Sequence, residues 1–145
     1  MTLDAATLLV HLRIVGVLFA LLVVVNLFVP RRLRWREEMA GLSLLNRQIF
    51  LVHSAFIILL LALFAALLLT SSDVLLEGTR LSRAILIGLT IFWGARMLAQ
   101  WFYYSPAVWR GNRFNTVMHY AFSAAWVYMT ATFAAALWLT MPRVE

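Results

Sequence analysis

The sequence predicts an all-α polytopic membrane protein: a four-transmembrane-helix bundle with a short cytoplasmic interfacial helix between the first and second spans. Of its 145 residues, 64% are hydrophobic and only 12% are charged, whereas about 45–50% of the residues in a soluble domain are apolar. Four apolar stretches of about 20 residues fill most of the chain, each long enough to cross a hydrocarbon core of about 30 Å. We therefore expect a single four-span domain over residues 1–145 and no separate soluble domain.

The four expected spans cover residues 8–29, 49–69, 84–104 and 114–139. In lipid every backbone N–H and C=O needs a partner within the protein, and four uniformly apolar spans are too few to close a β-barrel, so each span must be helical. Pro30 is expected to end the first span, and Pro106 follows the third. Asp4 stands where a signal peptide would carry a basic residue, so we expect the first span to remain in the mature protein.

The connection between the first two spans is long enough for structure of its own. In it Trp35, Met39 and Leu42 recur at i, i+4 and i+7 with charged residues between them, which predicts a short helix in the headgroup plane. Gly41 and Ser43 are residue types that end one helix and cap the next. An ordinary lipid-facing helix explains this segment better than a docking site for a partner.

The basic residues set the expected orientation, because positively charged loops stay in the cytoplasm. The first loop carries Arg31, Arg32, Arg34, Arg36 and Arg47, the third carries Arg110 and Arg113, and the N-terminal tail carries none. Both termini should then lie outside a bacterial-type inner (cytoplasmic) membrane. The net charge of +6 fits anionic lipid headgroups at Arg31, Arg32, Arg34 and Arg36. It does not fit nucleic acid, since no basic groove or aromatic stacking platform accompanies it.

Polar side chains within the spans are the functional candidates, because ionisable groups are costly inside a membrane. All six acidic residues fall in tails or loops, which argues against a carboxylate proton relay. At a rise of about 1.5 Å per residue, His53, Gln100 and His119 lie at about the same depth, roughly 6–8 Å inside the cytoplasmic face. Arg96 precedes Gln100 by four residues and therefore shares its helix face, one turn deeper.

These residues predict one binding site in the cytoplasmic half of the bundle. Arg96 has no acid at depth to neutralise it, so we expect a counter-charge from a ligand, a lipid phosphate or another subunit. On the fourth span, Ser123, Trp126 and Thr130 continue the face of His119. Hydrogen bonding between helices is the competing explanation for each polar residue. The cofactor-binding candidates are His53, Arg96, Gln100 and His119, with Trp93 and Tyr103 on the same stripe of the third span and His11 near the outer end of the first.

Three functions fit this set. The first is a redox cofactor in an electron-transfer protein. It would be haem b with His53 and His119 as axial metal ligands, or a quinone whose carbonyl oxygens accept hydrogen bonds from arginine, histidine, glutamine and tyrosine. The second is a non-catalytic accessory or assembly subunit without a cofactor, in which Arg96 pairs with an acid of another membrane subunit or of a second copy. The third is a small enzyme or transporter for an anionic amphiphile, with a histidine as base, although no familiar catalytic motif occurs.

A known family shares several of these features. They are the length, the four spans, the early His11, the Pro30-Arg31 pair that closes the first span and the Arg113-Phe114 step that opens the last. In these the chain resembles, mainly in topology, the small four-helix membrane protoporphyrinogen oxidases that bind haem b. The resemblance implies a haem-type bundle and places His11 at the position of the family's haem ligand. That family's pattern includes a lysine in the third helix, and this chain has no lysine.

Overall fold

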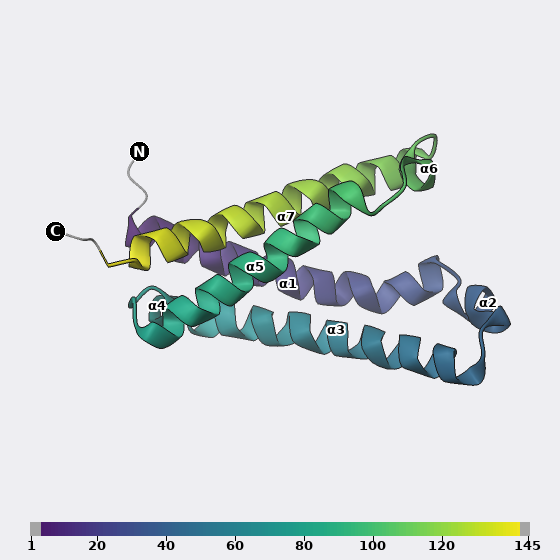
Figure 1. Ribbon diagram of the computed structural model, residues 1–145, viewed down its shortest axis with the longest axis horizontal. Coiled ribbons are helices and arrows are strands. Elements are labelled where there is room, and N and C mark those ends of the chain that lie inside the picture. The colour runs from purple at the N-terminus through teal and green to yellow at the C-terminus, as the bar shows by residue number, and fades with distance from the viewer. Residues whose placement is uncertain (1–3, 143–145) are drawn as a thin grey trace. The chain divides into compact units, whose positions relative to one another are not determined.

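The computed structural model describes residues 4–142, and all its regular elements in this range are helices (Figure 1). Four of them are long and apolar enough to cross a membrane: α1 (Ala5–Arg32), α3 (Leu44–Thr70), α5 (Arg80–Phe102) and α7 (Arg113–Thr140). Shorter helices connect them: α2 (Trp35–Glu38), η1 (Met39–Gly41), α4 (Ser72–Leu75) and α6 (Pro106–Trp109). The predicted all-α class with four candidate spans is confirmed.

The C-terminal ends of α1 and α5 each differ by two or three residues from the ends that the sequence predicts for the first and third spans. α1 continues through Pro30 to Arg32, because a proline in the last turn removes a single hydrogen bond and the following Leu33 N–H still donates to Val29 O. α5 ends at Phe102, before the predicted residue 104. The chain turns there because Ser105, with its extended ψ of 134°, caps the next helix, which begins at a proline.

The helices form two compact units. The α1–α3 unit covers residues 13–72, with most of α1, α2, η1 and α3. Among the described residues, the α5–α7 unit covers residues 73–142 together with residues 4–12, so it includes the first turns of α1 as well as α5, α6 and α7.

In the α1–α3 unit the two long helices run side by side in opposite directions (Figure 1). They approach closely at Gly16, where a Cβ atom would lie 3.0 Å from the Leu69 side chain and 3.1 Å from Leu68 Cβ. Towards the other end of the pair, Trp35 packs edge-on against Phe50 with ring centroids 4.7 Å apart. The predicted short helix between the first two spans is present as α2 followed by η1.

Polar side chains cap the N-terminal ends of long helices by accepting hydrogen bonds from backbone N–H groups. Ser43 caps α3, as predicted, by accepting from the Asn46 N–H at 3.3 Å. Asp4 caps α1, its Oδ1 accepting from the Thr7 N–H at 2.8 Å. Hydrogen bonds from the side chain and the backbone N–H of Thr7 lower the pKa of the Asp4 carboxyl from its ordinary value of 3.8. The helix ends are therefore encoded locally in the sequence.

In the α5–α7 unit the two long helices pack against each other and α6 joins them. Gly78 precedes α5 with φ +71°, and a Cβ atom there would lie 3.4 Å from Thr140 O, so this turn requires glycine. The buried apolar side chains of α5 and α7 are Leu86, Leu89, Trp93, Trp126, Met129, Phe133 and Ala136.

Large apolar side chains are exposed on all four long helices. Val10, Phe56, Ile91 and Val117 are examples, each more than half exposed. Soluble proteins rarely expose apolar side chains along whole helices. This surface supports a multi-pass membrane protein, whereas the kind of membrane and the orientation of the termini stay predictions.

Candidate functional site

A buried amide joins α5 and α7. Gln100 is 6% exposed, and its Oε1 accepts from Arg96 Nη1 at 3.2 Å and from Trp126 Nε1 at 3.4 Å. Its Nε2 lies 3.0 Å from His119 Nδ1. The structure thus brings together Arg96, Gln100 and His119 from the predicted set and adds Trp126. We call these four residues the Gln100 network.

The network assigns the proton on His119. Because the Gln100 oxygen faces two N–H donors, its nitrogen faces His119 and can only donate. His119 Nδ1 must then accept, and the neutral imidazole carries its proton on Nε2. Turning the amide over would set its NH₂ group against the Arg96 and Trp126 donors and leave both unsatisfied. His119 therefore presents an N–H donor at Nε2.

Arg96 is half-buried, and aromatic rings replace the missing counter-charge. Its Cζ lies 4.9 Å from the ring centroid of Trp126 and 5.7 Å from that of Tyr104, in the range of cation–π attraction. Within residues 4–142, no carboxylate lies within 4.0 Å of it. Gln100 accepts one of its five N–H donors. The positive charge is therefore held in place but not neutralised.

Stacked rings surround the network. Trp126 stacks on Trp93, with centroids 5.2 Å apart and planes 19° apart, and on Phe122, with centroids 5.8 Å apart. His119 stacks on Trp109 of α6, with centroids 4.3 Å and planes only 6° apart. Trp93, on the stripe of α5 that carries Arg96 and Gln100, therefore contacts the network through the ring of Trp126.

α7 positions α6, and with it Trp109. The Thr116 hydroxyl donates to Trp109 O at 2.6 Å, and Asn115 Nδ2 donates to Val108 O at 3.0 Å. Arg110 adds a cation–π contact, with its Cζ 5.3 Å from the Trp109 ring centroid. Sequence reasoning missed the role of Trp109, because it precedes His119 by ten residues across a turn and no helical spacing links the two.

Some buried polar atoms of this unit make no hydrogen bond in the described part of the chain. They are Trp109 Nε1, Ser123 Oγ and Thr130 Oγ1. An indole N–H can only donate, and a hydroxyl can donate as well as accept. Ser123 and Thr130 lie on the predicted face of α7 that carries His119. Among the described residues, the unit therefore contains further hydrogen-bond donors without an acceptor, in addition to those of the network.

Tyr103 lies outside this cluster. Its side chain is 84% exposed and meets Tyr104 edge-on, with centroids 6.1 Å apart. The tyrosine beside Arg96 is Tyr104. The spacing that placed Tyr103 on the stripe assumed a helix through residue 104, and α5 ends at Phe102.

The other two histidines have local partners. His11 Nδ1 lies 2.7 Å from the Tyr128 hydroxyl, with the rings edge-on at 5.8 Å. His53 belongs to the α1–α3 unit, where its Nδ1 donates to Ile49 O at 2.8 Å. Because a carbonyl only accepts, His53 carries its proton on Nδ1. The pairing of His53 with His119 around a haem stays a prediction. In residues 4–142 no group of three or more His, Cys, Asp or Glu side chains could hold a metal ion.

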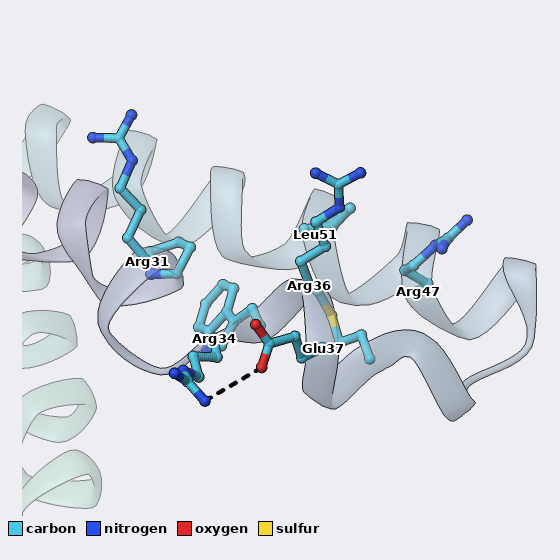
Figure 2. A pocket seen from close by; sticks show the side chains of 9 residues that line it. Arg31, Arg34, Arg36, Glu37, Arg47 and Leu51 are labelled. Carbon is cyan, nitrogen blue, oxygen red and sulfur yellow. Dashed lines mark ion pairs between the residues drawn. The ribbon is translucent and has the colours of Figure 1, made fainter.

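The α1–α3 unit contains a concave feature. A cleft of about 510 Å³ lies at the connection between its long helices, lined by four arginines, Arg31, Arg34, Arg36 and Arg47, with Glu37 and Trp35 among its other residues. Figure 2 shows the side chains of Arg31, Arg36 and Arg47 turned to one side of the cleft, and that of Arg34 turned to the other. We call this feature the arginine cleft.

Comparison of the chain with protein-family models, with curated proteins and with solved structures finds no match. The resemblance to the haem-b oxidases therefore stays a prediction. The Gln100 network and the arginine cleft are the two features of this chain that bear on its function.

Proposed function

We propose that the chain is a multi-pass membrane component that binds a lipid-soluble ligand of the quinone class at the Gln100 network. The supporting observation is the direction of the hydrogen bonds around Gln100. Its oxygen is taken by Arg96 and Trp126, and its nitrogen is turned to His119. The groups left over, His119 Nε2–H and the remaining N–H groups of Arg96, are all donors.

A ligand at such a site must supply acceptors. A quinone offers two carbonyl oxygens on an apolar ring, and the stacked indoles of Trp93 and Trp126 are suitable neighbours for a flat ring. A positive charge without a carboxylate strengthens a hydrogen bond to a carbonyl oxygen. Arg96 would therefore anchor the ligand, and His119 would orient it.

Haem b fits the network less well. An iron atom binds the unprotonated nitrogen of an imidazole, and in His119 that nitrogen, Nδ1, accepts from Gln100. Ligation through Nε2 would require the amide to turn over, which would leave the N–H groups of Arg96 and Trp126 without their acceptor. We therefore propose no role for His119 as an iron ligand.

Binding of a quinone can be measured on the full-length protein in nanodiscs. Titration with decyl-ubiquinone, followed by quenching of tryptophan fluorescence, should give saturable binding. We expect Arg96→Gln and His119→Phe each to weaken it about tenfold, since each removes a hydrogen-bond donor to the ligand. Arg80→Gln, at the exposed start of the same helix, is the matched control and should bind like the parent. Equal binding by all four folded proteins would refute the proposal.

The unneutralised charge of Arg96 also favours a second candidate, an accessory subunit whose partner contributes an acidic side chain within the membrane. Gentle solubilisation of native membranes should then recover a larger complex that Arg96→Gln releases and Arg80→Gln retains. Recovery of the parent protein alone, or only as an oligomer of itself, would argue against this candidate. The two candidates are distinguishable because quinone binding needs no second protein.

A further inference from the structure

The arginine cleft carries three positive charges that no acid in the described residues neutralises. Arg34 Nη1 lies 3.6 Å from Glu37 Oε2, so these two residues form an ion pair. Within residues 4–142, Arg31, Arg36 and Arg47 have no carboxylate within 4.0 Å, and their side chains turn to the same side of the cleft (Figure 2). Four arginines and one glutamate leave the lining with a net charge of +3. Three like charges on one side repel one another, and a multivalent anion removes that repulsion.

The backbone supports this separation of charges. Arg34 has φ 50° and ψ 41°, a left-handed conformation that a long L side chain rarely adopts. The Arg34 side chain pairs with Glu37, three residues later, so the acid of the cleft is engaged by Arg34 and not by the other three arginines. Arg47 lies near the beginning of α3, whose first turn contains no acid. The positive end of the helix dipole therefore adds to the field in the cleft.

An apolar groove adjoins the cleft. It has a volume of about 390 Å³ and shares Pro30, Trp35 and Leu51 with the cleft. The rest of its lining includes Phe50, Ile57 and Ile58.

The polar side chains of the groove wall are turned to their own helices. Asn26 Nδ2 donates to Leu22 O, and the Ser54 hydroxyl donates to Phe50 O, each at 2.8 Å. The groove thus presents a hydrocarbon surface directly beside a triply positive cleft. Trp35 lines both, at the junction between them.

We propose that the arginine cleft and the adjoining groove form a binding site for an anionic phospholipid. The phosphate is held by Arg31, Arg36 and Arg47, and an acyl chain lies in the groove past Trp35. A soluble phosphate would use the cleft but leave the groove empty, so the pairing of the two surfaces favours the lipid. This site is in the α1–α3 unit and does not depend on the quinone proposal.

Native mass spectrometry of the full-length protein in a neutral detergent can count and rank bound lipids. We expect dioleoyl-phosphatidylglycerol to bind at least about tenfold more tightly than dioleoyl-phosphatidylcholine. The triple variant Arg31→Gln, Arg36→Gln, Arg47→Gln should lose this preference. A control triple variant with the same loss of charge should keep it: Arg80→Gln, Arg83→Gln, Arg113→Gln.

Two further measurements separate the headgroup from the chain. Trp35→Ala should weaken the binding of phosphatidylglycerol several-fold, because it opens the junction between cleft and groove. Short-chain dihexanoyl-phosphatidylglycerol should displace the long-chain lipid at concentrations where inorganic phosphate does not. If the cleft triple variant does not fold, as judged by circular dichroism, Arg36→Gln alone tests the same contact from the short helix α2.

Two results would overturn the proposal. Equal loss of binding in both triple variants would mean that overall charge, and not this cleft, attracts the lipid. Displacement by inorganic phosphate as effective as by the short-chain lipid would mean that the cleft binds a free anion and the groove plays no part.

Discussion

Replacing Gln100 by leucine tests whether the α5–α7 seam depends on its buried amide. The substitution keeps a side chain of similar length but removes three hydrogen bonds, to Arg96, His119 and Trp126. Hydrogen bonds between membrane helices contribute about 0.6 kcal/mol each on average, which gives about 2 kcal/mol for the three. The unpaired guanidinium adds to this cost, because a charged group loses more than a neutral one when its partner goes.

The free energy of unfolding can be measured by steric trapping in bicelles, with tryptophan fluorescence as the signal. We expect Gln100→Leu to lower it by about 2–3 kcal/mol. Gln48→Leu is the matched control, because Gln48 is exposed on α3 and should change stability by less than about 0.5 kcal/mol. If the two variants are equally stable, the Gln100 network does not hold the helices together and the assignment of the His119 proton loses its basis.

Three further predictions can be tested separately. In Gln100→Glu the ionised carboxylate cannot donate a hydrogen bond, so the proton of His119 should move from Nε2 to Nδ1. The ¹⁵N chemical shifts of the imidazole report the tautomer. The same tautomer in the parent protein and in the variant would contradict this prediction. Gly88→Ala, with open space around its new Cβ atom, should raise the free energy of unfolding by up to about 1 kcal/mol. Gly16→Ala should not show this gain, because its new Cβ atom would crowd the side chains of α3. Equal gains for both variants in the unfolding assay would contradict this prediction. The ionised carboxylate of Asp4 should stabilise the start of α1, with its full effect at pH values above the ordinary pKa of 3.8. This stabilisation should be lost as the pH falls through the lowered pKa of Asp4. An NMR titration that finds a pKa of 3.8 or higher would refute the prediction.

Much of the architecture could be predicted from the sequence because membrane helices are encoded by length and hydropathy. The four long helices and the cap at Ser43 follow from local patterns that need no knowledge of neighbours. The ends at Arg32 and Phe102 could not be predicted as well. The first depends on how much free energy a proline costs in the last turn of a helix, and the second on where the following turn begins. In both cases local conformations of similar free energy compete.

The candidate site was predictable only as far as helical periodicity reaches. Spacing by four residues along α5 and depth along α7 were enough to place Arg96, Gln100 and His119 together. Tyr104 was missed because it lies beyond the end of α5, where rotation per residue no longer predicts direction. Trp109 was missed because it lies in a separate short helix, α6, which the spacing along α5 and α7 does not place. The arginines of the cleft were visible as a basic loop, but its groove was not, since its wall is made by residues of α1 and α3 that no sequence spacing relates.

Periodicity also cannot tell which polar groups donate and which accept, and at this seam that distinction decides the class of ligand. With His119 Nδ1 free to donate, as in a histidine that binds a metal, Nε2 would be a ligand and haem would be the natural occupant. Gln100 favours the opposite tautomer. Its oxygen accepts from two N–H donors, of Arg96 and Trp126, so its NH₂ group faces His119 Nδ1. With the amide in this orientation, His119 Nε2 is a hydrogen-bond donor. For this reason we propose a ligand that brings carbonyl oxygens.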